Sequence, residues 1–119
     1  MKLIKRLNDK FSWAFSGLKH AISEDTSVIT QILLAVIAIS LSFYLKLEKI
    51  DFIIIIIMCG LVISVELLNS SIEELSDYKC GNEYSSKIKI VKDLSASAVL
   101  VISITALIVG IMIFKSYIF

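Results

Sequence analysis

Four polar residues recur at helical spacing along one segment and offer the clearest chemistry in the sequence. Glu66, Asn69, Glu73 and Asp77 follow one another at intervals of three, four and four positions, which places them on one face of a helix. We call these four residues the polar row. The row begins inside an apolar segment, where an ionised side chain is costly unless it has a partner or a function. It therefore predicts a site that binds cations or transfers protons at a membrane surface.

Further charged residues are expected at the same surface. Glu24 and Asp25 precede the first long apolar segment, and Lys92 and Asp93 precede the third. Carboxylates that converge with a lysine indicate Mg²⁺ carrying a nucleotide, with Lys92 close to the phosphates. For Glu24 and Asp25 the alternative role is to cap a helix N-terminus, where acidic residues are favourable.

Within the polar row, Glu66 lies deepest and is suited to take a proton from a lipid hydroxyl, while Asn69 can orient that carboxylate or the hydroxyl. The sequence contains no P-loop, no dinucleotide-binding glycine motif and no Ser/His/Asp set. A proton or cation pathway also uses Glu and Asn at the edge of a span. From these residues alone, a membrane enzyme and a small proton- or cation-handling membrane subunit both remain open.

The composition specifies the elements that must position these residues. Hydrophobic residues make up 57% of the 119 residues, and proline is absent. The mean hydropathy is +0.87. Three apolar segments, 28–47, 50–68 and 96–114, approach the ~20 residues that a helix needs to cross a bilayer. The sequence thus predicts an all-α membrane protein with three transmembrane helices in a single membrane domain, 1–119.

Residues 2–23 predict a different kind of helix. Apolar side chains, Phe11 and Phe15 among them, recur at helical spacing, and lysines occupy most of the remaining surface. Such a basic amphipathic helix lies in the membrane interface. Gly17 falls in mid-helix, which indicates either close approach by a neighbouring helix or ligand, or a kink.

The basic residues predict the orientation of the chain. With three crossings, the N-terminal segment and the 69–94 loop share one side, and the 46–51 turn and the C-terminus share the other. Nine Lys and Arg residues fall on the first side and three on the second. The first side is therefore expected in the cytoplasm, where ATP and Mg²⁺ are available to the polar row.

The sequence resembles the family of prokaryotic diacylglycerol kinases, which also includes undecaprenol kinases. The segment from Glu66 to Asp77 matches the family pattern E-x-x-N-[ST]-[SA]-[ILV]-E-x-x-V-D, except that Ser76 replaces Val. A second pattern, A-K-D-x-[GA]-[SA]-A-A-V-L, appears at 91–100 with Lys92 and Asp93 intact. Its departures are Val91, Ser95 and Ser97.

The resemblance implies roles for individual residues. Glu66 becomes the catalytic base, Asn69 its neighbour in the site, and Glu73 a Mg²⁺ ligand. The family's second metal-binding carboxylate falls on Asp25, with Glu24 as the alternative. The implied nucleotide and phosphate contacts are Arg6, Asp77, Glu83, Lys92 and Asp93.

The resemblance further implies transfer of the γ-phosphoryl group of MgATP to diacylglycerol in a bacterial cytoplasmic membrane, by a homotrimer whose subunits share sites. The segment Gly81-Asn-Glu83-Tyr84 resembles the G-x-E-Y of the diacylglycerol kinases, whereas Ser85 stands in place of their following histidine. An undecaprenol kinase is the alternative within the family, and an inactive member is a third possibility given the serine departures.

Overall fold

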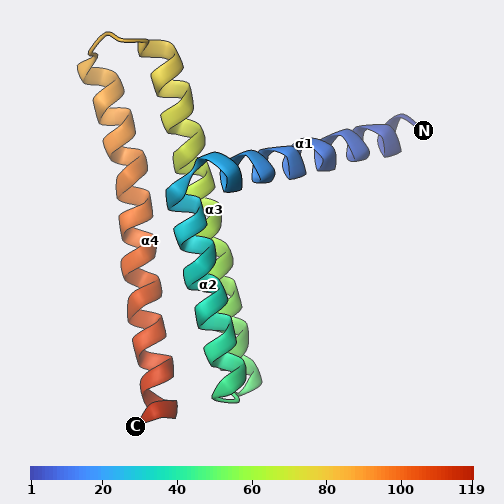
Figure 1. Cartoon of the computed structure of the whole chain (residues 1–119), viewed down its shortest axis with the longest axis vertical. Coiled ribbons are helices and arrows are strands. Elements are labelled where there is room, and N and C mark those ends of the chain that lie inside the picture. Colours follow the sequence, from blue (N-terminus) through green and yellow to red (C-terminus); the bar gives the residue numbers. More distant parts are fainter.

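The computed structural model describes all residues 1–119 as four helices joined by short connections (Figure 1). They are α1 (Lys2–Glu24), α2 (Thr26–Tyr44), α3 (Lys49–Cys80) and α4 (Ser86–Ile118). The last three are long and apolar enough to cross a membrane. The predicted all-α fold with three candidate spans after an N-terminal helix is confirmed.

Helix α3 is the central spanning helix, and α2 and α4 both run antiparallel to it (Figure 1). Both α2 and α4 pack against α3; in Figure 1, α2 lies in front of the lower part of α3, and α4 lies to the left of both. The connection between α2 and α3 and the C-terminus share one end, while α1 and the connection between α3 and α4 lie toward the other (Figure 1). This arrangement brings the N-terminal helix to the same half of the bundle as the polar row.

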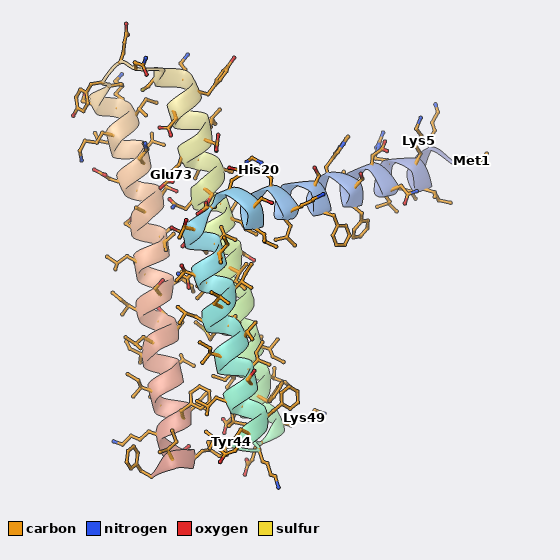
Figure 2. All side chains as sticks on the ribbon, in the orientation of Figure 1. Met1, Lys5, His20, Tyr44, Lys49 and Glu73 are labelled. Atoms are coloured by element: carbon orange, nitrogen blue, oxygen red, sulfur yellow. The ribbon has the colours of Figure 1, made fainter.

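Helix α1 runs across the direction of the spanning helices rather than along them (Figure 1). Its apolar side chains, including Phe11, Trp13 and Phe15, are exposed, and Lys5 lies on the upper side of α1 in Figure 2, the side of the connection between α3 and α4. An exposed aromatic face opposite a basic one suits a helix in the plane of a membrane interface. The predicted range 2–23 is one residue shorter than the observed helix.

The interior of the bundle is small and unusually polar. Only ten residues are buried, and five of them are polar: Ser42, Glu66, Asn69, Ser76 and Ser95. Large apolar side chains instead cover the outside. In water this distribution would be unfavourable, whereas in lipid the polar groups belong inside, where other protein groups can bond to them.

The bounds of the spanning helices differ from the sequence-based expectation. Helix α2 ends at Tyr44 rather than at residue 47, and Lys46 takes a positive φ of 55° in the turn that follows. The apolar segments 50–68 and 96–114 are parts of helices of 32 and 33 residues. The region 69–94 is therefore not a loop but a helical hairpin whose connection, 81–85, turns at Gly81 with φ 59°.

The extension of α3 has a direct consequence for the site. Residues 69–80 add about 18 Å of helix beyond the apolar segment, at 1.5 Å per residue. The polar row consequently runs from the end of the apolar segment outward on one continuous helix. Its deepest member and its outermost member occupy very different surroundings.

Candidate active site

The polar row follows a gradient of burial along α3. Glu66 is 4% exposed and Asn69 is 9% exposed, whereas Glu73 and Asp77 are exposed. The buried end therefore faces the apolar interior and the other end faces solvent. A row with this gradient can connect a reactant held in lipid with one that arrives from water.

Asp25 is brought against the row from the junction between α1 and α2. One carboxylate oxygen caps α2, accepting hydrogen bonds from the backbone N–H groups of Ser27 at 2.9 Å and Val28 at 3.3 Å. The other oxygen accepts a hydrogen bond from the hydroxyl of Ser70 on α3. Asp25 therefore both starts α2 and contributes a carboxylate beside the row, while Glu24 is exposed at the end of α1 and does not cap α2.

Several charged and polar groups surround the Glu66 carboxylate. The negative charges of Asp25 and Glu73 act on this carboxylate. Gln31 on α2 and Asn69 provide hydrogen-bonding groups beside it. A carboxylate that has other negative charges nearby is stabilised by a bound cation or by a shared proton. Asp25 thus adds a carboxylate from another element to those of the polar row.

The amide of Asn69 contacts α4 through its oxygen and Glu73 of the row through its nitrogen. Its Oδ1 accepts a hydrogen bond of 2.7 Å from the hydroxyl of Ser95. Its Nδ2 donates a hydrogen bond of 3.3 Å to Oε1 of Glu73. The amide is thus held from both sides at the point where α3 and α4 pack together.

The outer end of the row carries a basic partner. The ammonium of Lys92 donates a hydrogen bond of 2.8 Å to a carboxylate oxygen of Asp77. Lys92 precedes the apolar segment of α4, and this hydrogen bond, together with the charge of Asp77, raises the pKa of the lysine, which keeps it cationic at neutral pH. Asp93 instead pairs with Lys89 one turn earlier on α4, at 2.6 Å.

A cleft of about 870 Å³ separates the second half of α1 from the outer part of α3. Glu73 and His20 lie near the crossing of these helices (Figure 2). Gly17 lines the cleft, and a Cβ built on it would meet no other atom within 4 Å, so no neighbouring helix of this chain approaches it. The polar side chains of the lining include Glu24, Asp25, Ser70, Glu73, Glu74 and Asp77.

The size and lining of this cleft suit the phosphates of a nucleotide with its metal ion. Within one chain no three acidic, histidine or cysteine side chains are grouped as a metal site. Mg²⁺ usually takes only one or two protein carboxylates and completes its coordination with water and substrate phosphates. Asp25 and Glu73, oxygen donors that line the same cleft, fit that requirement.

Of the five predicted nucleotide contacts, only Asp77 lines the cleft. Lys92 reaches it through its hydrogen bond to Asp77, and Asp93 pairs with Lys89 instead. Arg6 belongs to the first half of α1, and Glu83 belongs to the connection between α3 and α4; neither lines the cleft. Figure 1 shows the first half of α1 extending away from the bundle. One copy of the chain therefore gathers the row, Asp25 and Lys92, but not Arg6, Glu83 and Asp93.

Three polar residues at the site carried no prediction of a role. Ser70 holds Asp25, Ser95 holds Asn69, and Gln31 lies beside Glu66. Gln31 offered a signal in the sequence, because an amide inside a spanning segment is costly without a partner. The two serines offered no comparable signal, since serine is common at packed helix surfaces in membranes.

The fold and the site define a three-span membrane protein with an acidic, partly buried site at one end of its bundle. The sequence profile of a family described as prokaryotic diacylglycerol kinase matches residues 12–114. The chain therefore belongs to the prokaryotic diacylglycerol kinase family, whose members are ATP-dependent lipid kinases.

Individual relatives agree with this placement. A diacylglycerol kinase from Helicobacter pylori is 34% identical over 100 residues, which cover 84% of this chain and 77% of the relative. One from Haemophilus influenzae is 32% identical over 98 residues, covering 82% of each chain. A diacylglycerol kinase from Synechocystis is 33% identical over 100 residues; these cover 84% of this chain but only 57% of that relative.

Proposed function

We propose that the protein transfers the γ-phosphoryl group of MgATP to the hydroxyl of diacylglycerol, giving phosphatidic acid. The observation that supports this most directly is the gradient along α3. Glu66 is buried at the apolar end, and the acidic cleft opens beside Glu73 at the solvent end. A lipid hydroxyl and a water-soluble nucleotide can meet only at such a boundary.

In the proposed reaction Glu66 is the general base. It takes the proton from the lipid hydroxyl as that oxygen forms a bond to the γ-phosphorus of ATP. The bond between the γ-phosphorus and the bridging oxygen breaks at the same time, and ADP leaves with the electron pair. The proton on Glu66 then returns to solvent, and Asn69 keeps the carboxylate oriented.

The remaining residues hold the phosphates. Asp25 and Glu73 would ligate Mg²⁺, with Glu24 as the alternative ligand, and the ion supplies charge neutralisation on the phosphate oxygens. Lys92 places a positive charge beside Asp77 at the wall of the cleft. Arg6, Glu83 and Asp93 are proposed as further nucleotide contacts.

We further propose a homotrimer in a bacterial cytoplasmic membrane, with the N-terminus and the 69–94 hairpin on the cytoplasmic side. The exposed apolar surface of the spanning helices leaves room for subunit contacts. A neighbouring copy would supply the residues that one chain leaves distant from its cleft, Arg6 and Glu83 in particular.

The proposal is tested by ATP turnover in mixed micelles with Mg²⁺, with diacylglycerol and undecaprenol offered separately. The wild type should phosphorylate diacylglycerol, and Glu66→Gln should lose turnover while it still binds ATP. Turnover with undecaprenol alone would establish the undecaprenol kinase instead. No turnover with either lipid by folded protein, together with ion flux that Glu66→Gln abolishes, would establish the cation-handling alternative.

A further inference from the structure

A buried hydrogen bond ties the polar row to α4. The hydroxyl of Ser95 lies 2.7 Å from Oδ1 of Asn69. Both residues are 9% exposed, and they come from different spanning helices, 26 positions apart in the chain. The hydroxyl is therefore shielded from solvent and directed at a residue beside the proposed base.

The chemistry of the neighbours determines which way the Asn69 amide points. The carboxylates of Glu66 and Glu73 can accept hydrogen bonds but, when ionised, cannot donate them. The Nδ2 group must therefore face them, as the 3.3 Å contact to Glu73 shows. Oδ1 is then directed toward α4, where a buried carbonyl oxygen requires a donor.

Ser95 is that donor, and the side chain expected at its position could not replace it. The family pattern places Gly or Ala there, and neither has a side-chain donor. We propose that Ser95 is a positioning residue that fixes the Asn69 amide with its N–H groups toward the Glu66 and Glu73 carboxylates. The inference rests on the proposed function, in which these carboxylates accept the proton and hold the metal ion.

Ser97 provides a matched control on the same helix. It is exposed, and its hydroxyl donates a hydrogen bond of 2.7 Å to the backbone carbonyl of Leu94. Ser97→Ala removes the same atoms from α4 as Ser95→Ala but does not alter the surroundings of Asn69. A difference between the two variants therefore reports on the contact to Asn69.

The first measurement is steady-state kinetics in mixed micelles. We expect Ser95→Ala to lower kcat about tenfold and to change KM for ATP less than about twofold, because the misplaced amide acts on the chemical step. Ser97→Ala should stay within about twofold of the wild type in both constants. Equal kinetics for the two variants would overturn the positioning role.

The second measurement observes the amide without reference to activity. The chain has three asparagines, Asn8, Asn69 and Asn82, so ¹⁵N-asparagine labelling of the full chain in detergent gives three side-chain amide signals. Asn69→Ala identifies the signal of Asn69. We expect its hydrogen exchange to be about tenfold faster in Ser95→Ala and unchanged in Ser97→Ala, because a lost hydrogen bond exposes the amide.

The two measurements separate the possible failures. Unchanged exchange in Ser95→Ala would overturn the inference whatever the kinetics. Faster exchange with unchanged kcat would overturn the positioning role and leave a structural contact. A folded wild type without lipid-dependent turnover would overturn the proposed function and the positioning role with it. The exchange data would still test whether the hydrogen bond between Ser95 and Asn69 protects the amide.

Discussion

The ammonium of Lys92 lies 2.8 Å from a carboxylate oxygen of Asp77, and this pair joins α4 to the outer end of the polar row. Asp77 lines the acidic cleft between α1 and α3. The pair therefore holds a positive charge beside a cleft whose lining includes no lysine or arginine. Phosphate groups entering the cleft would offer the lysine further oxygen acceptors.

Replacing this lysine should affect turnover far more than stability. We expect Lys92→Met to lower kcat/KM for ATP about 100-fold, because a fixed positive charge on the transferring phosphoryl group is lost. The midpoint of thermal unfolding should hardly change, since solvent-exposed ion pairs contribute little. The kcat/KM for ATP and the midpoint of thermal unfolding are both measured on one preparation in mixed micelles.

Lys89→Met is the control for Lys92→Met. Lys89 pairs with Asp93 on the same helix, and Asp93, unlike Asp77, does not line the cleft. Its substitution should leave kcat/KM within about threefold of the wild type. Losses of similar size in the two variants would contradict a specific role for Lys92.

Substitutions of Asp25 can separate its two roles. Asparagine caps a helix about as well as aspartate, so Asp25→Asn should change the free energy of unfolding by less than about 0.5 kcal/mol. It should raise the Mg²⁺ concentration for half-maximal turnover by about tenfold or more, because an anionic ligand is lost. Asp25→Ala should add a stability loss of about 0.5–2 kcal/mol, the usual effect of removing an N-cap.

Measuring the Mg²⁺ concentration for half-maximal turnover also distinguishes between Glu24 and Asp25 as the metal ligand before α2. Glu24 is exposed and does not cap α2, so Glu24→Gln should leave both stability and the Mg²⁺ requirement near those of the wild type. A raised Mg²⁺ requirement in Glu24→Gln, with a normal one in Asp25→Asn, would transfer the metal role to Glu24.

Gln31 should matter to the reaction although it lies in a spanning segment. Leucine has a similar size but cannot hydrogen-bond, so Gln31→Leu removes a polar neighbour of Glu66. We expect kcat to fall about tenfold with little change in KM for ATP. Gln31 and Ser103 both line an apolar cavity of about 350 Å³ between the spanning helices, so Ser103→Ala, on α4, is the control. An equal loss of kcat in both variants would argue against a role for Gln31.

The opposite end of the bundle should contribute to stability alone. The hydroxyl of Tyr117 donates a hydrogen bond of 2.7 Å to Asp51 and accepts one of 2.9 Å from the backbone N–H of Glu48. These contacts fasten the end of α4 to the start of α3. Tyr117→Phe should lower the midpoint of thermal unfolding by roughly 2–6 °C and leave kcat unchanged.

Tyr78→Phe is the matched control for Tyr117→Phe, because Tyr78 is 87% exposed. Circular dichroism of the folded protein in detergent, recorded during heating, gives both midpoints. Equal midpoints for the two variants would show that the contacts of Tyr117 do not stabilise the bundle.

Properties that depend on short segments could be predicted from the sequence. Hydropathy predicted three spans, and periodicity predicted both the amphipathic helix at 2–23 and the alignment of Glu66 with Asp77 on one face. These predictions succeed because the bilayer sets the length of a spanning helix, and because a helix repeats every 3.6 residues whatever its neighbours are.

The contacts between polar groups of different helices could not be predicted from the sequence. Ser70 reaches Asp25 across 45 positions of the chain, Ser95 reaches Asn69 across 26, and Gln31 lies beside Glu66. Each of these contacts depends on how two helices are rotated and shifted relative to one another. Hydropathy does not specify that rotation or shift, because many faces of an apolar helix are equally acceptable to lipid.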